Sequence, residues 1–423
     1  MANTDISDLK FPTDFFWGAA TSAHQVEGGN HNSWSEWEIA NADRLAQEAK
    51  ERCDRKGINW EKVSDRALNP QNYISGKAAD HYHLYEQDFD LLKSLGLNSY
   101  RFSIEWSRVE PEFGKFNDQE IAHYQRVIAA LRERDIEPFV TLWHWTIPTW
   151  FRDRGGWANK DAARYFADFV SRIVGCCINA DYWITLNEPE VYVNQSYLAG
   201  DWPPQRKSYW DYFSLLNGLI EAHNYVTDAV RQLRPGAKLG VAHNITKIEA
   251  TPDNPLNRFG VSVVNWWTNR YLLDRVVEKS DFIGLNYYFR RYLNITPFVK
   301  KAQPSGPMSD MGWELYPEGI YHVLKGLQKY RKPVFITEHG LADADDKLRE
   351  WYMTESLRNM QKAMREGVDV RGYFHWSLLD NFEWDKGFWP RFGLIEVDFE
   401  TQERKVRESA KRLGEIVRGS HAS

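Results

Sequence analysis

Cysteine is scarce in this chain, which holds only Cys53, Cys176 and Cys177 among its 423 residues. Three cysteines cannot form the disulfide framework of a small secreted domain, and no CxxC or Cys/His spacing indicates a zinc site. We therefore expect a protein of the reducing cytoplasm.

Long apolar runs and an excess of basic charge are also missing. No uninterrupted apolar run reaches the roughly eighteen residues of a transmembrane helix, and the opening MANTDISDLKFPTDFF lacks the basic and apolar regions of a signal peptide. The 53 basic residues face 59 acidic ones, for a net charge of −6. Because no broad basic field is available for phosphate groups, we expect neither nucleic acid nor a membrane surface as a partner.

Glycine- or serine-rich linkers, low-complexity tracts and repeats are absent too, so we expect one domain spanning residues 1–423. Within it, the charged stretch from about residue 28 to 77 is too long for a simple connection and predicts a functional insertion. The end of the chain, 418–423 (RGSHAS), resembles a cloning remnant, and we assign it no structure.

Aromatic side chains, in contrast, are abundant: 19 Trp, 21 Tyr and 22 Phe make up 15% of the sequence. Many stand beside polar groups, as in TLWHWTIPTW and HWSLLDNFEW, rather than in apolar runs. Such segments suit stacking against the apolar faces of sugar rings, although aromatic side chains also serve as plain core filler.

Eight apolar, β-rich segments alternate with amphipathic helical segments along the chain. An alternation of this kind is typical of an α/β fold, and eight units predict a single (β/α)8 TIM barrel with long βα loops. The predicted strands lie at 15–21, 99–104, 137–142, 182–188, 237–243, 282–288, 334–340 and 370–378.

Two glutamates stand where such a barrel builds its active site. Glu188 follows the fourth strand in YWITLNEP, and Glu338 follows the seventh in VFITEHG. A charged carboxyl after a buried strand emerges at the carboxyl end of the barrel, where the strand ends converge. Two converging carboxyls indicate hydrolysis of a glycosidic bond. Other polar and aromatic side chains accompany them, without a cluster of metal ligands. They are the amides Gln25, Asn187 and Asn286, the imidazole His144, the indoles Trp376 and Trp384, and Arg101, Tyr287 and Glu383.

Six motifs also make the chain recognisable: WGAATSAHQVEG, YRFSIEWSRVEP, TLNEP, GLNYY, ITEHG and WSLLDNFEWDKGFWPRFGL. In this order, and across nearly the whole chain, they resemble the signatures of family 1 glycoside hydrolases, the retaining β-glycosidases. The resemblance implies a TIM-barrel enzyme that needs no metal or other cofactor and acts on a small β-glycoside or an oligosaccharide.

The resemblance also implies roles for single residues. Glu188 resembles the general acid/base, and Glu338 resembles the nucleophile. The residues that resemble the sugar-binding set are Gln25, His144, Asn187, Tyr287 and Glu383, with Trp376 as a stacking floor and Trp384 as a further contact. Arg101 and Tyr287 resemble neighbours that keep the nucleophile ionised, and Asn286 and His339 support the pair.

Elementary chemistry agrees with these roles. The two carboxyls of a retaining glycosidase stand about 5 to 5.5 Å apart, so that one attacks the anomeric carbon while the other protonates the leaving oxygen. Two carboxyls that close do not ionise together readily. We expect the one beside Arg101 to stay charged, and its partner to have a raised pKa and to hold the proton.

The chain departs from the family pattern at two places. His339 follows the nucleophile where the family usually has Asn; we interpret it as a tolerated neighbour, the alternative being an imidazole that shifts the pH optimum. The segment NWWTNRYLLDRVVEKSDFIGLNYY is shorter than usual before the sixth strand, which puts the leaving-group side in question. Members that act on 6-phosphorylated sugars generally carry Ser where this chain has Glu383, so we predict an unphosphorylated sugar.

The sequence thus predicts an exo-acting, retaining β-glycosidase of the β-glucosidase type, which works by double displacement. Two alternatives stay open: a carbohydrate-binding barrel without catalysis, and an endo-acting glycanase of the same barrel clan. The choice among glucose, galactose, fucose and mannose, the aglycone, and the oligomeric state, including a homo-oligomer, are not fixed by these patterns.

Overall fold

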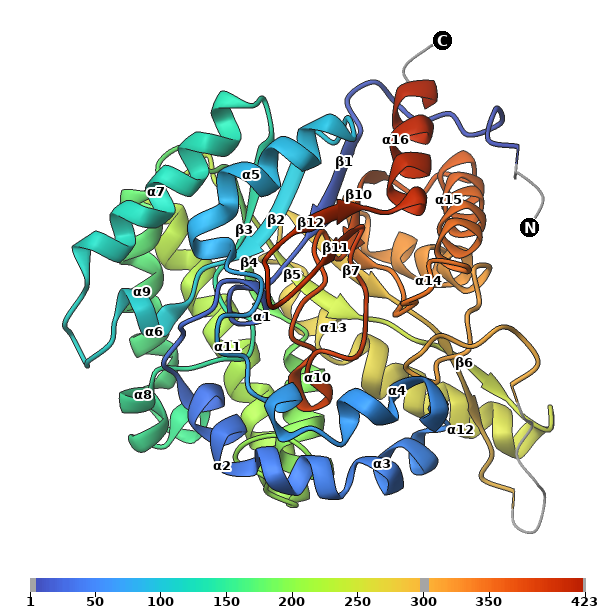
Figure 1. Cartoon of the computed structure of the whole chain (residues 1–423), viewed down its shortest axis with the longest axis horizontal. Helices are drawn as coiled ribbons and strands as arrows, with labels where there is room; N and C mark the ends of the chain where they lie inside the picture. The colour runs from blue at the N-terminus through green and yellow to red at the C-terminus, as the bar shows by residue number, and fades with distance from the viewer. Residues whose placement is uncertain (1–4, 297–303, 421–423) are drawn as a thin grey trace.

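Eight parallel strands close into a barrel in the computed structural model, which describes residues 5–296 and 304–420 (Figure 1). Around the barrel the strands follow the order β1, β10, β9, β7, β5, β4, β3, β2. The ends of each lie within two residues of those of a segment predicted from the sequence, so the predicted TIM barrel is confirmed. The bounds are β1 Phe16–Ala20, β2 Ser99–Ser103, β3 Glu137–Thr141, β4 Tyr182–Asn187, β5 Lys238–Asn244, β7 Phe282–Tyr287, β9 Val334–His339 and β10 Val370–Trp376.

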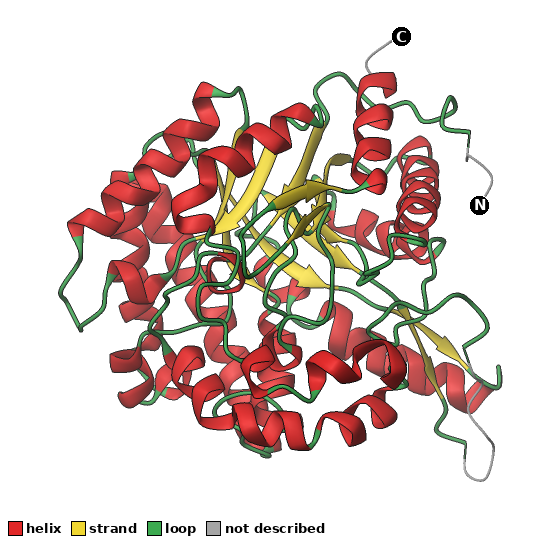
Figure 2. Ribbon diagram, in the orientation of Figure 1, coloured by secondary structure: helices red, strands yellow, loops and turns green. Residues whose placement is uncertain are grey.

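Helices return the chain from the end of one strand to the start of the next and cover the outside of the barrel (Figure 2). In α7 the cap is Asn117, whose side chain accepts from the backbone N–H groups of Gln119 and Glu120, and the buried positions recur every three or four residues. The main covering helices are α5 His81–Ser94, α7 Asp118–Glu133, α9 Ala162–Cys176, α11 Tyr209–Leu233, α14 Gly319–Leu327, α15 Arg349–Arg365 and α16 Glu408–Ser420. Residues 418–420, to which the sequence analysis assigned no structure, end α16; residues 421–423 lie outside the described residues.

Aromatic rings fill the inside of the barrel. The ring of Phe139 lies 4.7 Å from that of Phe374 and 5.2 Å from that of Phe335, which in turn lies 5.1 Å from Phe282. Gly240 makes room for this packing, because a Cβ at that position would lie 2.4 Å from the Phe282 ring. The interior is therefore a packed core, and polar side chains gather at the carboxyl ends of the strands.

Long loops rise over these carboxyl ends. The stretch from residue 28 to 77 folds into α2 Ser33–Gln47, α3 Ala49–Lys56, α4 Trp60–Ala67 and the short η1 Pro70–Tyr73, seen in blue along the lower edge of Figure 1. On another side, β6 Lys247–Ala250 pairs with β8 Arg290–Leu293, and α12 Pro255–Asn265 packs beside them. None of the described helices combines the length and the apolar character needed to cross a bilayer.

Candidate active site

A cavity of about 370 Å³ opens at the carboxyl ends of the barrel strands. It brings together side chains from loops that are up to about 360 residues apart in sequence, as parallel strands of a barrel do. Most of the residues predicted from the sequence line it: Gln25, His144, Glu188, Glu338, Trp376, Glu383 and Trp384. Arg101, Asn187 and Asn286 lie directly behind these, fully buried.

Glu338, at the end of β9, is held at both carboxylate oxygens. Arg101, from β2, donates to its Oε1 over 2.6 Å, and the Tyr288 hydroxyl donates to its Oε2 over 2.6 Å. The guanidinium of Arg101 is oriented by further bonds to the Thr337 carbonyl and the Thr141 hydroxyl. Burial raises the pKa of Glu338, and the charge of Arg101 opposes that rise most strongly. Glu338 is thus built to carry a negative charge in a dry site.

Glu188 follows β4, and its hydrogen-bond donors among the described residues are neutral amides. Asn286 and Asn244 donate to its Oε1 over 2.7 and 3.0 Å. Burial, together with the charge of Glu338, raises the pKa of Glu188 to about 8. Glu188 therefore keeps its proton at neutral pH while Glu338 is ionised.

The backbone at Glu188 is in the left-handed region, with φ of 43°, directly before α10 Pro189–Val193. A non-glycine residue there costs on the order of 1 to 3 kcal/mol and persists only where its surroundings fix it. The Glu188 N–H donates to the Ala242 carbonyl on the neighbouring β5, which helps to hold this turn. The turn directs the carboxyl into the cavity rather than along the strand.

Asn187 connects the two carboxyl sites to His144. Its Oδ1 accepts from Arg101 over 2.6 Å and from Asn286 over 3.2 Å, so its Nδ2 is the atom that donates to His144 Nε2 over 3.1 Å. Burial, aided by the charge of Arg101, holds the pKa of His144 well below its ordinary value. The imidazole is therefore neutral with its proton on Nδ1, which bonds to no described residue and is available to a ligand.

On the opposite wall, Glu383 and Gln25 form a second polar pair. Gln25 Nε2 donates to Glu383 Oε2 over 3.2 Å and to Asn381 Oδ1 over 3.0 Å. Burial raises the pKa of Glu383 to about 8, against the charge of the nearby Lys386 ammonium. At neutral pH the Glu383 carboxyl can consequently both donate and accept a hydrogen bond.

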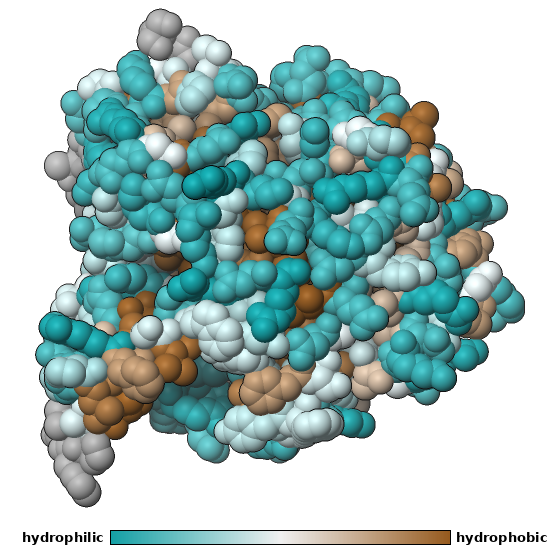
Figure 3. All heavy atoms as spheres, turned by 180° about the vertical axis from the view of Figure 1, so that it is seen from behind, coloured by the Kyte–Doolittle hydropathy of each residue, from teal (hydrophilic) through white to brown (hydrophobic). Residues whose placement is uncertain are grey.

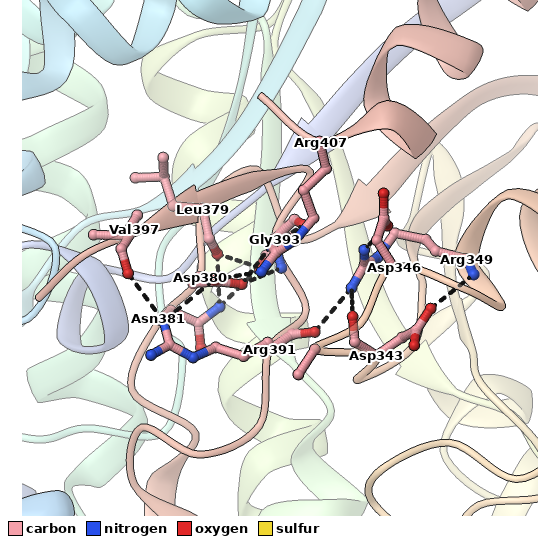
Figure 4. Close-up of polar contacts among 12 residues, drawn as sticks. Asp343, Asp346, Arg349, Leu379, Asp380, Asn381, Arg391, Gly393, Val397 and Arg407 are labelled. Atoms are coloured by element: carbon pink, nitrogen blue, oxygen red, sulfur yellow. Dashed lines mark hydrogen bonds and ion pairs between the residues drawn. The ribbon is translucent and has the colours of Figure 1, made fainter. Parts of the chain in front are cut away.

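The loop after β10, which carries Glu383, is anchored from below by Asp380. Figure 4 shows Arg391 and Arg407 meeting at this carboxylate. Arg407 donates two bonds to it, each of 2.9 Å, and the Gly393 N–H adds a third of 2.9 Å. Asp380 is fully buried, and two parallel bonds from one guanidinium to its carboxylate fix the orientation of the Asp380 side chain as well as its position. It therefore sets the path of the chain toward the cavity.

Two indoles complete the pocket. Trp376, the last residue of β10, lies 5.8 Å from the His144 ring in a stacked orientation. Trp384 is packed among Trp34, Trp145 and His24, whose ring centroids lie 4.6, 4.8 and 5.6 Å from its own. Both indoles are nearly buried by the protein itself, so their exposed edges are rigid surfaces for a ligand.

The structure corrects the prediction for Tyr287. Its hydroxyl donates to the Tyr316 carbonyl over 2.7 Å, outside the cavity, and Tyr288 is the tyrosine that bonds to Glu338. Successive side chains of a strand point to opposite faces, so Asn286 and Tyr288 face inward while Tyr287 faces outward. The GLNYY motif contains both tyrosines, and this alternation is the signal that distinguishes them. Asn244, at the end of β5, was also missed, because no motif surrounds it.

His339 faces away from Glu338 for the same reason. Its Nδ1 contacts the Tyr373 hydroxyl over 2.9 Å, and its ring stacks on Tyr352 with centroids 4.7 Å apart. Burial lowers the pKa of His339 to about 3, so it stays neutral across the physiological range. This placement favours a tolerated neighbour over an imidazole that tunes the pH optimum.

The described residues contain no group of three or more His, Cys, Asp or Glu side chains arranged to hold a metal ion. The described lining of the cavity offers an ionised carboxylate, two protonated carboxyls, amides, a neutral imidazole, a phenol and indoles, together with the basic side chains of Lys56, Arg291 and Lys386. A polyhydroxylated ring with an apolar face fits such a set of groups.

Comparison with known proteins agrees with this arrangement. The glycosyl hydrolase family 1 model matches residues 7–282 and 269–421. Beta-glucosidase A of Thermotoga maritima is 33% identical over 460 aligned residues, covering 97% of this chain and 98% of that protein. A beta-galactosidase of Pyrococcus woesei is 29% identical over 513 aligned residues, covering 96% of this chain and 97% of that protein. Among solved structures, a beta-glycosidase from Pyrococcus horikoshii is 36% identical with a TM-score of 0.84, covering 97% of this chain and 96% of that one. The chain belongs to glycosyl hydrolase family 1.

Proposed function

We propose that this glycoside hydrolase is an exo-acting, retaining β-glycosidase in which Glu338 is the nucleophile and Glu188 is the general acid/base. The observation that carries the proposal is the contrast between the two carboxyls in one cavity. Glu338 is paired with a buried arginine, whereas Glu188 accepts hydrogen bonds from two amides and has a pKa of about 8. Environments that push two pKa values apart in this way are what acid and nucleophile roles require.

In the first step, Glu338 attacks the anomeric carbon while Glu188 gives its proton to the glycosidic oxygen. The bond to the leaving group breaks as the ester to Glu338 forms. The charge of Glu338 is thereby lost, and with it the repulsion that, second to burial, raises the pKa of Glu188. Glu188, now ionised, takes a proton from water, which attacks the same carbon and releases Glu338. Two inversions leave the product with the configuration of the substrate.

The remaining residues would hold the sugar. The free Nδ1–H of His144, the Asn187 amide and the Gln25 and Glu383 pair supply donors and acceptors for hydroxyl groups, and Trp376 supplies a flat apolar surface. Because Glu383 and Trp384 form one wall of the cavity, a terminal sugar suits it better than the middle of a long chain. The relatives named for glucosidase and galactosidase activity support gluco- and galacto-configured substrates as the first to test.

A mechanism-based label tests the proposal directly. A 2-deoxy-2-fluoro β-glucoside with a dinitrophenyl leaving group should form an ester slowly hydrolysed by the enzyme, because fluorine destabilises the oxocarbenium-like transition state. We expect one adduct per chain by intact mass, and peptide mapping should place it on Glu338. An adduct on another residue would overturn the assignment, and binding of plain glucose without any adduct or turnover would favour a carbohydrate-binding barrel.

A pair of tyrosine variants tests the corrected site geometry. Tyr288→Phe removes a hydrogen bond to a charged carboxylate, an interaction worth about 1.5 to 3 kcal/mol, so we expect kcat/KM to fall roughly 10- to 100-fold. Tyr287→Phe is the matched control, since its hydroxyl donates to the Tyr316 carbonyl outside the cavity, and its kcat/KM should stay near that of the parent. Steady-state kinetics on one aryl glycoside suffices; equal losses in both variants would contradict the placement.

We also propose one catalytic domain over residues 1–423 and a cytoplasmic location. The closed barrel from β1 to β10 supports the first, since the long insertions contribute to the same cavity. The second is supported by the three cysteines, all of which are free thiols in the structure.

A further inference from the structure

Helix α12 carries an apolar stripe that faces away from the protein. Leu256, Phe259, Val263 and, one turn on, Trp266 recur every three or four residues and so lie along one side of the helix. Phe259 is 67% exposed, and the other three are between 41% and 49% exposed. Gly260 is buried and packs against Leu293 and against Ile295, which is itself 44% exposed. An apolar stripe of this kind normally packs into the core of a protein, but on α12 it is open to solvent.

The stripe continues onto the start of the neighbouring helix α11. There Phe213 lies 4.8 Å, ring to ring, from Trp267, which lies 6.1 Å from Trp266. Figure 3 shows the apolar part of this surface as the brown group at the lower left. We name the whole surface the α11–α12 face; it comprises Tyr209, Trp210, Phe213, Leu256, Phe259, Val263, Trp266 and Ile295.

The α11–α12 face is larger than the apolar patches of ordinary monomers. Large side chains bury about 150 to 250 Å² each, so eight that are roughly half exposed present roughly 600 to 1,000 Å². The largest patch on a typical monomer is about 300 to 600 Å² and often marks an interaction site. A standard protein interface takes about 800 Å² from each partner, which this face can supply.

Charge around the face indicates what covers it. Arg258 is paired with Asp253 over 2.6 Å, and Arg206 with Asp211 over 3.2 Å, so its two basic borders are neutralised within the chain. A surface for an anionic partner would leave these arginines unpaired. A border whose charges are paired, around an apolar centre, instead suits the same face of a second copy. A two-fold axis would place the α12 stripe of one copy on the α12 stripe of the other.

The sequence around the face also departs from the family. The family model matches in two stretches that overlap at residues 269–282, directly after the stripe. We propose that the α11–α12 face joins two copies of this chain in solution, with the two α12 helices packed against each other about a two-fold axis.

Sedimentation equilibrium on the whole chain tests this proposal. We expect a species of twice the 49.6 kDa chain mass at micromolar concentration, and Phe259→Glu should raise the dissociation constant at least 100-fold. Ile178→Glu is the matched control, because Ile178 is 65% exposed but lies outside the face. Turnover of an aryl glycoside by each variant checks that it is folded. A monomer at all concentrations, or a dimer that Phe259→Glu leaves intact, would overturn the proposal.

Cross-linking distinguishes a two-fold contact from other occupants. Three variants carry a single new cysteine at Leu256, Phe259 or Val263. A residue near a two-fold axis lies close to the same residue of the other copy. We therefore expect diamide to oxidise the two thiols of at least one variant to a disulfide that links the two chains. The parent chain is the control, because it keeps the buried Cys53 and Cys177 and the partly exposed Cys176. A dimer in which none of the three cross-links would contradict this face, and a monomer that sediments with phosphatidylcholine vesicles would assign it to a lipid surface instead.

Discussion

Replacing Glu338 by alanine should lower kcat at least roughly 10⁴-fold, the scale seen when a covalent nucleophile is removed. The loss follows from geometry, because Glu338 is the carboxylate paired with Arg101, whereas Glu188 and Glu383, the other carboxyls in the described lining, hold their protons at neutral pH. The variant keeps Glu188 and the sugar-binding residues, so KM should change far less than kcat. Turnover near the parent level would show that Glu338 is not the nucleophile.

Azide should restore part of the lost turnover and reveal which face is attacked. The space left by the Glu338 carboxyl admits a small anion, which attacks the anomeric carbon of an activated dinitrophenyl β-glycoside and gives an α-glycosyl azide. Glu338→Gln is the matched control, because its amide fills the same space and leaves no room for azide. The anomer is read by NMR, and a β-azide from Glu338→Ala would contradict attack from this side. Circular dichroism is needed alongside, since the charge of Arg101 is left unpaired in both variants.

The barrel was predictable because its signals are local. Each strand is a short apolar run between helical segments, and each such run appears in the structure to within two residues. The convergence of Glu188 and Glu338 followed from the fold alone, because the carboxyl ends of parallel barrel strands meet on one face.

The contacts that tune the site were less predictable because they join distant parts of the chain. Arg52 of α3 pairs with Asp385, and Arg407 with Asp380, and neither partner carries a signal for the other. Side-chain direction at a strand end was a second limit. Whether Tyr287 or Tyr288 reaches Glu338 depends on which of the two side chains faces the inside of the barrel. Because the two residues are identical and adjacent, composition does not distinguish them.

Replacing Glu188 by alanine should lower kcat/KM most for substrates whose leaving groups need a proton in order to depart. For alkyl glycosides and disaccharides, general acid catalysis contributes roughly 10² to 10⁴, and we expect kcat/KM to fall by that factor. For a dinitrophenyl glycoside, whose leaving group departs as a stable anion, kcat/KM should be nearly unchanged. Equal losses on both substrates would exclude Glu188 as the acid.

The pH dependence of the same variant gives an independent measurement. In the parent, kcat/KM for a poor leaving group should fall as pH rises through about 8, because Glu188 then loses the proton it must donate. It should also fall at low pH, where Glu338 becomes protonated, at a value above the ordinary pKa of a glutamate. Since Glu383 has a similar pKa, Glu383→Gln is the control: the alkaline limb should persist in that variant and vanish in Glu188→Ala. If the alkaline limb instead vanishes in Glu383→Gln and persists in Glu188→Ala, it reports the titration of Glu383. Glu188 would then not be the acid that protonates the leaving group.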